Sequence, residues 1–182
     1  MSYFRELLPN LMHIRHATIE DAEVLTGLAI DTMQESFGPP HNPAELVDAY
    51  IQDTYSVPIL RQELADPRST YLLLETPAGE SLGYARLYRH APPRRMRERR
   101  ALEIQRIYLR QACLGQGLGR QLMNYCLEQA RVEGYKAVWL GVWERNQRAL
   151  AFYRKIGFEP FGWHYFQFGP ERQRDYWLHK SL

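Results

Sequence analysis

A glycine-rich turn is the pattern with the clearest chemical meaning in this chain. Residues 114–119 read LGQGLG and lie between an apolar run and an amphipathic one. Glycines let backbone amides approach an anion without interference from Cβ, and a helix that begins here adds free N–H groups and the positive end of its dipole. A phosphate group is the expected guest. Tight packing is the alternative reason for the glycines. The spacing differs from that of the nucleotide-kinase loop and from that of the dinucleotide-binding fingerprint.

A second pattern follows in the next helical segment. Asn146 and Tyr153 stand seven positions apart, so in a regular helix they share one face at a separation of about 10 Å. The amide could bind an extended ligand at one point, and the phenol could reach the ligand's reactive end. A helix N-cap and a core tyrosine are the alternative interpretation.

The elements that must position these residues follow from hydrophobic periodicity and from Gly and Pro punctuation. Strands are predicted at 11–15, 70–75, 82–88, 102–109, 137–142, 158–168 and 176–182, and helices between Thr18 and Gly38 and at 43–55, 58–64, 117–133 and 146–156. The turn at 77–79 predicts an antiparallel hairpin, and helices between later strands predict parallel pairing. Val24 and Leu25 belong to the predicted apolar stripe of the first helix. The fold class is therefore α/β with a single mixed sheet.

These motifs together resemble the GCN5-related N-acetyltransferase (GNAT) superfamily. The residues that carry the resemblance are Ile107-Tyr108-Leu109, the turn from Gly115 to Arg120, Asn146, Ala151-Phe152-Tyr153 and Gly157-Phe158. It covers 102–182 closely and the first half loosely. Within the superfamily, Gly162, His164 and the runs at 102–108 and 139–144 are most similar to the PaiA-type polyamine acetyltransferases.

The resemblance implies a fold and a domain layout. The GNAT fold has a mixed central sheet of about seven strands, splayed in the middle and flanked by helices. A single domain over 1–182 is expected, in which 18–66 forms the acceptor-side helices and 102–160 forms the acetyl-CoA-binding core.

The resemblance also implies acetyl-CoA as co-substrate and assigns residues to it. The backbone of Ile107, Tyr108 and Leu109 would pair with the pantetheine arm. The pyrophosphate would be held by the amides of Gly115, Gln116, Gly117, Leu118, Gly119 and Arg120. Asn146 would contact the cofactor, and Tyr153 would lie near the sulfur and assist the departing thiolate after direct attack by a neutral primary amine.

Two positions depart from the family pattern. Leu114 stands where relatives usually carry Arg or Gln, so one side-chain donor to the phosphates is missing while the amides remain. Gln105 stands where many polyamine-type members carry a carboxylate, and a neutral amide cannot accept the amine's proton. Glu103 is two residues earlier on the same face of a regular strand, and it is the alternative base; a satisfied strand-end acid is the other interpretation.

The charge distribution bears on the acceptor. Between Thr18 and Asp66 ten carboxylates stand against the single cation Arg61, a net charge of −9 in a chain whose total is +2. Because the first two helices of the superfamily line the acceptor side, a small cationic amine such as a polyamine is the predicted substrate. Asp31 and Glu35, one helical turn apart, are the predicted substrate-binding residues. A solvated acidic surface is the alternative.

Other features exclude several classes. Two cysteines, Cys113 and Cys126, give neither a disulfide framework nor a zinc-binding spacing, so no metal is expected. No apolar run approaches the ~18 residues of a membrane span, and a cytoplasmic monomer or homodimer without nucleic-acid or membrane partners is predicted. The arginine-rich stretch 92–100 is interpreted as a solvated loop rather than a phosphate patch.

Two other functions remain open at this point. A protein or peptide N-acetyltransferase would use the same chemistry and could also have an acidic cleft. A catalytically weak regulator that binds coenzyme A would explain Leu114 and Gln105 as signs of decay, although Asn146 and Tyr153 are intact.

Overall fold

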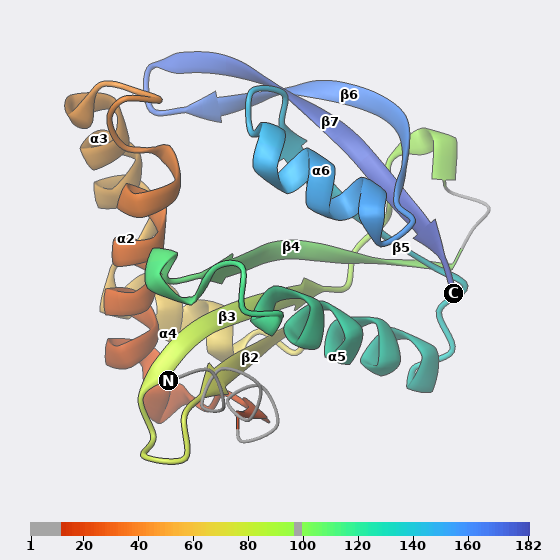
Figure 1. Ribbon diagram of the computed structural model, residues 1–182, viewed down its shortest axis with the longest axis horizontal. Coiled ribbons are helices and arrows are strands. Elements are labelled where there is room, and N and C mark those ends of the chain that lie inside the picture. Colours follow the sequence, from red (N-terminus) through yellow and green to blue (C-terminus); the bar gives the residue numbers. More distant parts are fainter. Residues whose placement is uncertain (1–11, 97–99) are drawn as a thin grey trace.

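The computed structural model describes residues 12–96 and 100–182. Their strands form one mixed seven-stranded sheet with the order β1-β2-β3-β4-β5-β7-β6 (Figure 1). The strands are β1 (His13–His16), β2 (Ser69–Glu75), β3 (Ser81–Tyr88), β4 (Ala101–Leu109), β5 (Ala137–Trp143), β6 (Glu159–Phe168) and β7 (Glu171–Ser181). The helices are α2 (Ala22–Phe37), α3 (Ala44–Thr54), α4 (Val57–Ala65), α5 (Leu118–Val132) and α6 (Gln147–Lys155). The predicted fold class is confirmed.

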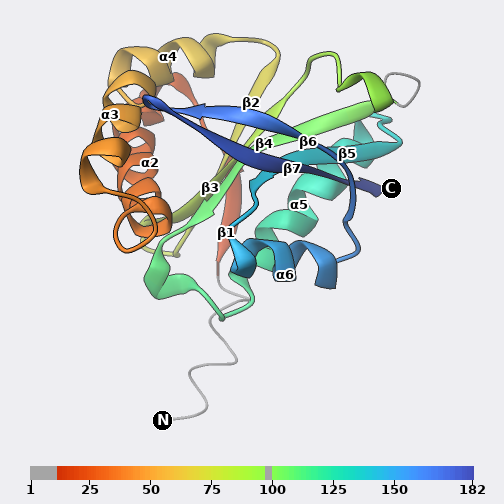
Figure 2. The same cartoon turned by 90° about the horizontal axis from the view of Figure 1, so that it is seen from above.

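Helices cover both faces of the sheet (Figure 2). α5 and α6 pack on one face, and α2, α3 and α4 pack on the other. Because successive side chains of a strand point to opposite faces, Leu72 and Leu74 of β2 belong to the core under α5, whereas Tyr71 and Leu73 belong to the core under α2. The α5 and α6 face is called the cofactor-side face below, and the α2 face is called the acceptor-side face.

Helix periodicity predicted α5 well and α2 less well. Periodicity in 117–133 predicts that Gly134 ends this helix and that six apolar residues share one face: Leu118, Leu122, Met123, Cys126, Leu127 and Ala130. All six are buried, and Gly134 follows α5 with φ +78°. In α2, however, Val24 is 51% exposed, so its place in the apolar stripe was wrong. The buried stripe runs through Leu25, Leu28 and Thr32, and this spacing turns position 24 toward solvent.

The C-terminal hairpin differs most from the sequence prediction. β7 begins at Glu171 rather than Tyr176, because the polar run before Tyr176 completes a ladder with β6. β7 also lies between β5 and β6 and pairs antiparallel with both, so parallel pairing is confined to β4 and β5. The tip of the hairpin reaches α3, where Phe168 packs against Tyr50 at 4.7 Å between ring centroids (Figure 1).

Candidate active site

β4 and β5 separate in the middle of the sheet. Their parallel pairing consists of three residue pairs and ends at Glu103 and Trp139. Beyond this point β4 stays paired with β3 as far as Leu109, and β5 stays paired with β7 as far as Trp143. The two facing edges therefore present backbone N–H and C=O groups that no strand of the described chain covers. An extended ligand could pair with them as an additional strand, and Ile107, Tyr108 and Leu109 lie on this open part of β4.

A β-bulge distorts β4 at the opening. Arg86 of β3 pairs with Arg106 and Leu87 pairs with Ile104, so Gln105 is the extra residue. Bulges re-aim side chains and are common beside active sites. The Gln105 side chain accepts a hydrogen bond from Arg86 Nη1 at 2.7 Å, which fits a structural role better than that of a base.

The glycine turn has the geometry of an anion site. Gly115 and Gly117 have φ of +79° and +82°, and a Cβ built on either would meet no atom within 4 Å. Gly117 also precedes α5 as its N-terminal cap. Packing does explain Gly119, whose Cβ would lie 3.4 Å from Leu109 Cδ1. Two of the three glycines thus leave open space above the first amides of α5, as a phosphate requires.

The side chains of this turn contribute less than its backbone. Gln116 Nε2 donates to the Ala112 carbonyl at 2.8 Å and so closes the turn on itself. Leu118 is buried in the core, and Arg120 is exposed on the first turn of α5. Arg120 is thus the residue of this turn that carries a cationic side chain.

Asn146 is the N-cap of α6, as one of the two interpretations of the sequence holds. Its Oδ1 accepts a hydrogen bond from the Ala149 backbone N–H at 3.0 Å. This bond satisfies one of the free amides at the helix start. The side-chain NH₂ group is what Asn146 can offer to a cofactor, and that contact stays a prediction.

Tyr153 is a buried tyrosine that stays protonated. It is 7% exposed, and its ring packs against Phe152 and Phe158 at 5.4 and 5.5 Å. Burial raises its pKa, and Cys126 raises it further, so the phenol keeps its proton at neutral pH. The pKa of Tyr108 on β4 is raised mainly by burial, and next by Tyr55, Tyr50 and Tyr153. A protonated phenol is the form a general acid needs.

Glu103 lies where β4 and β5 begin to separate, and it has a partner that the sequence did not reveal. Its side chain is 12% exposed, and Oε2 lies 2.7 Å from His90 Nε2. Burial raises the pKa of the Glu103 carboxyl, and the neighbouring His90 opposes this shift. The His90 ring also contacts Trp139, whose buried Nε1 has no hydrogen-bond partner in residues 12–96 and 100–182.

We expect Glu103→Gln to lower kcat/KM by about 100-fold, within the range for loss of a general base, because a carboxylate with a raised pKa accepts a proton more readily. The change is measured by coenzyme A release at saturating acetyl-CoA. His90→Gln is the control: an equal loss in that variant would mean that Glu103 acts by holding His90. Unchanged kcat/KM in Glu103→Gln would leave Glu103 as a strand-end acid.

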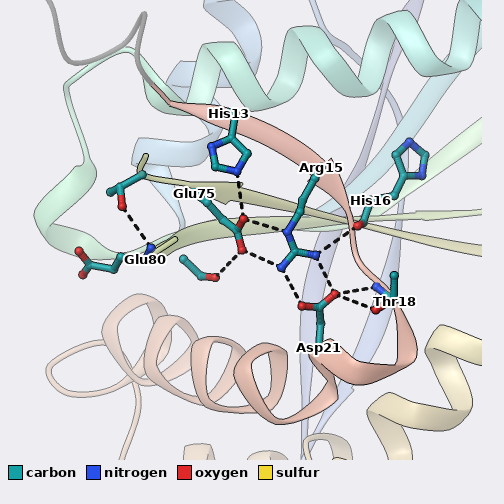
Figure 3. Close-up of polar contacts among 9 residues, drawn as sticks. His13, Arg15, His16, Thr18, Asp21, Glu75 and Glu80 are labelled. Carbon is teal, nitrogen blue, oxygen red and sulfur yellow. Dashed lines mark hydrogen bonds and ion pairs between the residues drawn. The ribbon is translucent and has the colours of Figure 1, made fainter. Parts of the chain in front are cut away.

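Four of the ten carboxylates of the acidic segment 18–66 pair with arginines that lie outside it. Arg15 connects Asp21 at the start of α2 to Glu75 of β2, at 2.7 and 2.8 Å (Figure 3). The pKa of Asp21 falls to about 2, mainly because of Arg15. The same carboxylate accepts the Thr18 backbone N–H, as the acid of a capping box does. The net charge of −9 is thus partly neutralised in the folded protein.

Asp31 and Glu35 are also engaged. Asp31 Oδ2 accepts from Arg110 Nη1 at 2.8 Å, and Glu35 Oε2 accepts from the Gln111 backbone N–H at 2.6 Å. Both contacts connect α2 to the segment between β4 and the glycine turn. The structure therefore places these two residues beside the predicted cofactor loop, and their binding to an acceptor stays a prediction.

A buried charge network that the sequence analysis did not find lies beside the bulge. Glu63 of α4 accepts from Arg86 and Arg106, each at 2.6 Å, and from the Tyr71 hydroxyl. The pKa of Glu63 is lowered, since these donors outweigh the desolvation that would raise it. The three charged residues are far apart in sequence, so no local pattern could have shown that they meet.

The arginine-rich stretch has several structural contacts. Arg95 Nη1 donates to the Phe161 carbonyl at 3.1 Å, and Arg100 Nη2 donates to the Glu133 carbonyl at 2.9 Å. Arg97 and Arg99 lie outside the described residues. Within the described chain, no helix is long and apolar enough to cross a membrane, and no group of His, Cys, Asp and Glu has a metal-binding arrangement.

Comparison with known proteins gives a consistent result. Residues 30–158 match the Acetyltransferase (GNAT) family. An uncharacterized N-acetyltransferase from the pepI 3′ region of Lactobacillus delbrueckii subsp. lactis is 32% identical over 163 residues, 90% of this chain and 93% of that protein.

Two solved structures share the fold. PaiA N-acetyltransferase from Thermoplasma acidophilum, in complex with coenzyme A, superimposes with a TM-score of 0.77 at 20% identity, over 94% of this chain and 99% of that one. The spermidine/spermine N-acetyltransferase SpeG from Vibrio cholerae gives 0.66 at 18% identity, over 96% and 94%.

Proposed function

The chain belongs to the GNAT acetyltransferase family and is an acetyl-CoA-dependent N-acetyltransferase, and from this premise we propose that its acceptor is the primary amine of a small cationic molecule, most specifically a polyamine such as spermidine. The gap between β4 and β5, with the glycine turn at its wide end, supports acetyl-CoA binding, and the carboxylates of the acceptor-side face are the observation that carries the proposal for the acceptor. In this arrangement the phosphates of the cofactor would lie at the glycine turn, and the pantetheine arm would extend from there along β4 into the gap.

The residues fit a coenzyme A moiety. Open space above Gly115 and Gly117 suits a pyrophosphate, and the uncovered edge of β4 from Arg106 to Leu109 suits the two amides of a pantetheine arm. Arg120 adds a positive charge at the phosphate end, which offsets the donor missing at Leu114. When bound, acetyl-CoA supplies the acetyl group as a thioester.

The chain's own residues then act on the two sides of the gap. On the cofactor-side face, the protonated phenol of Tyr153 donates to the sulfur that leaves. On the acceptor-side face, Glu103 takes the proton of the amine, directly or through one water. Backbone N–H groups on the open edge of β4 beside the bulge are donors for the charge that develops on the carbonyl oxygen.

Electrostatics supports a cationic acceptor. Glu103 lies on the acceptor-side face of β4, since its neighbours Leu102 and Ile104 point into the opposite core. Further carboxylates stay exposed on the helices of this face: Glu23, Glu45, Asp48 and Asp53. The structural neighbour SpeG is named for spermidine and spermine, and it has the same fold.

Purified protein with acetyl-CoA is expected to release coenzyme A when spermidine or spermine is added. The KM for spermidine should rise steeply between low and high salt, because attraction between exposed charges is screened over about 8 Å at physiological ionic strength. For a monoamine with no other charged group, the KM should change little with salt. Thiol release is the measurement, with amino acids, aminoglycosides and lysine peptides assayed in parallel.

Each other outcome has a definite meaning. Turnover of lysine or amino-terminal peptides in preference to every small amine would replace the proposal with protein N-acetylation. Binding of coenzyme A without turnover of any amine would support a regulator instead.

A further inference from the structure

Gly141 leaves the position of a side chain open on the acceptor-side face, and this position is called the hollow below. Gly141 is exposed and stands two residues beyond Trp139, on the part of β5 that has left β4. Val142 and Leu140 point into the cofactor-side core, so the missing side chain of Gly141 would point to the acceptor side. A Cβ built there would lie 3.6 Å from both Asp175 Oδ2 and His164 Nε2. Two polar atoms thus converge on a point that only a glycine leaves open.

His164, which borders the hollow, belongs to a stack of aromatic rings. His164 stacks on Trp177 with 5.1 Å between centroids and 17° between planes, and Trp177 stacks on Phe161 at 5.8 Å. In the sheet Asp175 stands opposite Trp143 of β5 and His164 of β6. A carboxylate binds organic cations through charge-assisted hydrogen bonds.

The Asp175 carboxylate has an environment suited to a ligand. It is half-buried, and within the described residues the causes of its pKa shift are burial first and Glu144 second, with no hydrogen bond among them. Together they raise the pKa to about 6. Glu144 is itself held by Arg174, whose Nε donates to it at 2.6 Å. A buried charge without a donor is costly, and an arriving ammonium group would remove that cost.

We propose that Asp175 binds the ammonium group of the acceptor in the hollow above Gly141, with His164 as a second contact. The inference rests on the proposed function, since it assumes that the acceptor is a cationic amine. Asp175 and Glu103 then lie on the same face on either side of the gap, so one could hold the acceptor while the other serves its reactive nitrogen. Asp175 is thus a specificity-determining residue.

The proposal predicts a pH dependence of acceptor binding. Asp175 is charged above about pH 6 and becomes neutral as the pH falls through this value, so the affinity for a polyamine should fall there. The other ionisable groups around it are Glu144, Arg174 and His164. Burial lowers the pKa of His164, so its ring is neutral at pH 7 and gains a repelling charge only at lower pH.

The test is calorimetric titration of spermidine into the full-length protein saturated with coenzyme A, from pH 5 to pH 8. Asp175→Asn is expected to weaken spermidine binding at pH 7.5 by about tenfold or more and to remove the fall in affinity near pH 6. His164→Gln should keep that fall. Glu171→Gln, an equal charge change on the exposed start of β7, should alter affinity by less than about twofold.

Gly141→Ala provides a second, independent variant. Its methyl group would lie at ordinary contact distance from Asp175 and His164, so the fold is kept while the hollow is filled. We expect about tenfold weaker spermidine binding with unchanged affinity for coenzyme A. This variant decides the question even if Asp175→Asn does not fold.

The outcomes separate this inference from the proposed function. Wild-type spermidine affinity in both Asp175→Asn and Gly141→Ala would overturn the inference, even if the enzyme acetylates polyamines. Loss of binding in both variants, together with no thiol release from any amine, would support the hollow as a cation site and overturn the proposed function.

Discussion

Replacing Tyr153 by phenylalanine should lower kcat while the affinity for acetyl-CoA changes little. Removal of one donor aimed at developing charge costs roughly 2 to 4 kcal/mol, which is about 30- to 900-fold in kcat. The ring stays in place among Phe152 and Phe158, so packing is preserved. The effect falls on kcat because the sulfur carries negative charge only as the thiolate departs.

The measurement is steady-state coenzyme A release, combined with calorimetry for cofactor affinity. Tyr125→Phe is the matched control, since Tyr125 is a half-buried tyrosine of α5 that packs against the same core. Equal melting temperatures of the two variants would exclude a folding effect. Weaker cofactor binding at an unchanged kcat would mean that Tyr153 only packs.

Gly117→Val should abolish measurable coenzyme A binding in a protein that still folds. A branched side chain would fill the open space above the amides of the turn, and the left-handed backbone would be strained by about 1 to 2 kcal/mol. The expected loss in affinity is at least about 100-fold by calorimetry.

Gly79→Val is a well-matched control for this variant. Gly79 lies in the turn between β2 and β3 with φ +84°, and it also has nothing within 4 Å of its Cβ position. It therefore carries the same backbone strain without the predicted phosphate site. Normal coenzyme A affinity in folded Gly117→Val would place the phosphates elsewhere.

Local patterns predicted those parts of the molecule that depend on local interactions. The α5 stripe and the stop at Gly134 were predicted correctly, because each follows from helix periodicity or from a conformation that glycine favours. The glycine turn was predicted from its own residues, whereas the gap between β4 and β5 follows from the family resemblance, and the structure has both.

Contacts between distant residues could not be predicted in this way. His90, which follows β3, meets Glu103 of β4, and Asp175 of β7 stands opposite His164 of β6, because paired strands bring residues that are far apart in the sequence side by side in the sheet. The strand from Glu171 was missed because its alternation is polar and its pairing with β5 and β6 decides its structure. The attraction of the acidic segment for a cation was overestimated, because Arg15 and Arg110, which lie outside the segment, pair with two of its carboxylates.

The gap between β4 and β5 divides the sheet into two halves that three residue pairs join directly. One half is an antiparallel unit from β1 to β4, and the other is the unit of β5, β7 and β6. A cofactor that pairs along the open edges would act as the missing strand between them. Part of its binding free energy would then appear as resistance to unfolding, by the mass-action relation for a ligand that binds only the native state. Cofactor affinity and the cooperativity of unfolding of the whole sheet would therefore both measure the pairing of the cofactor with the open edges of β4 and β5.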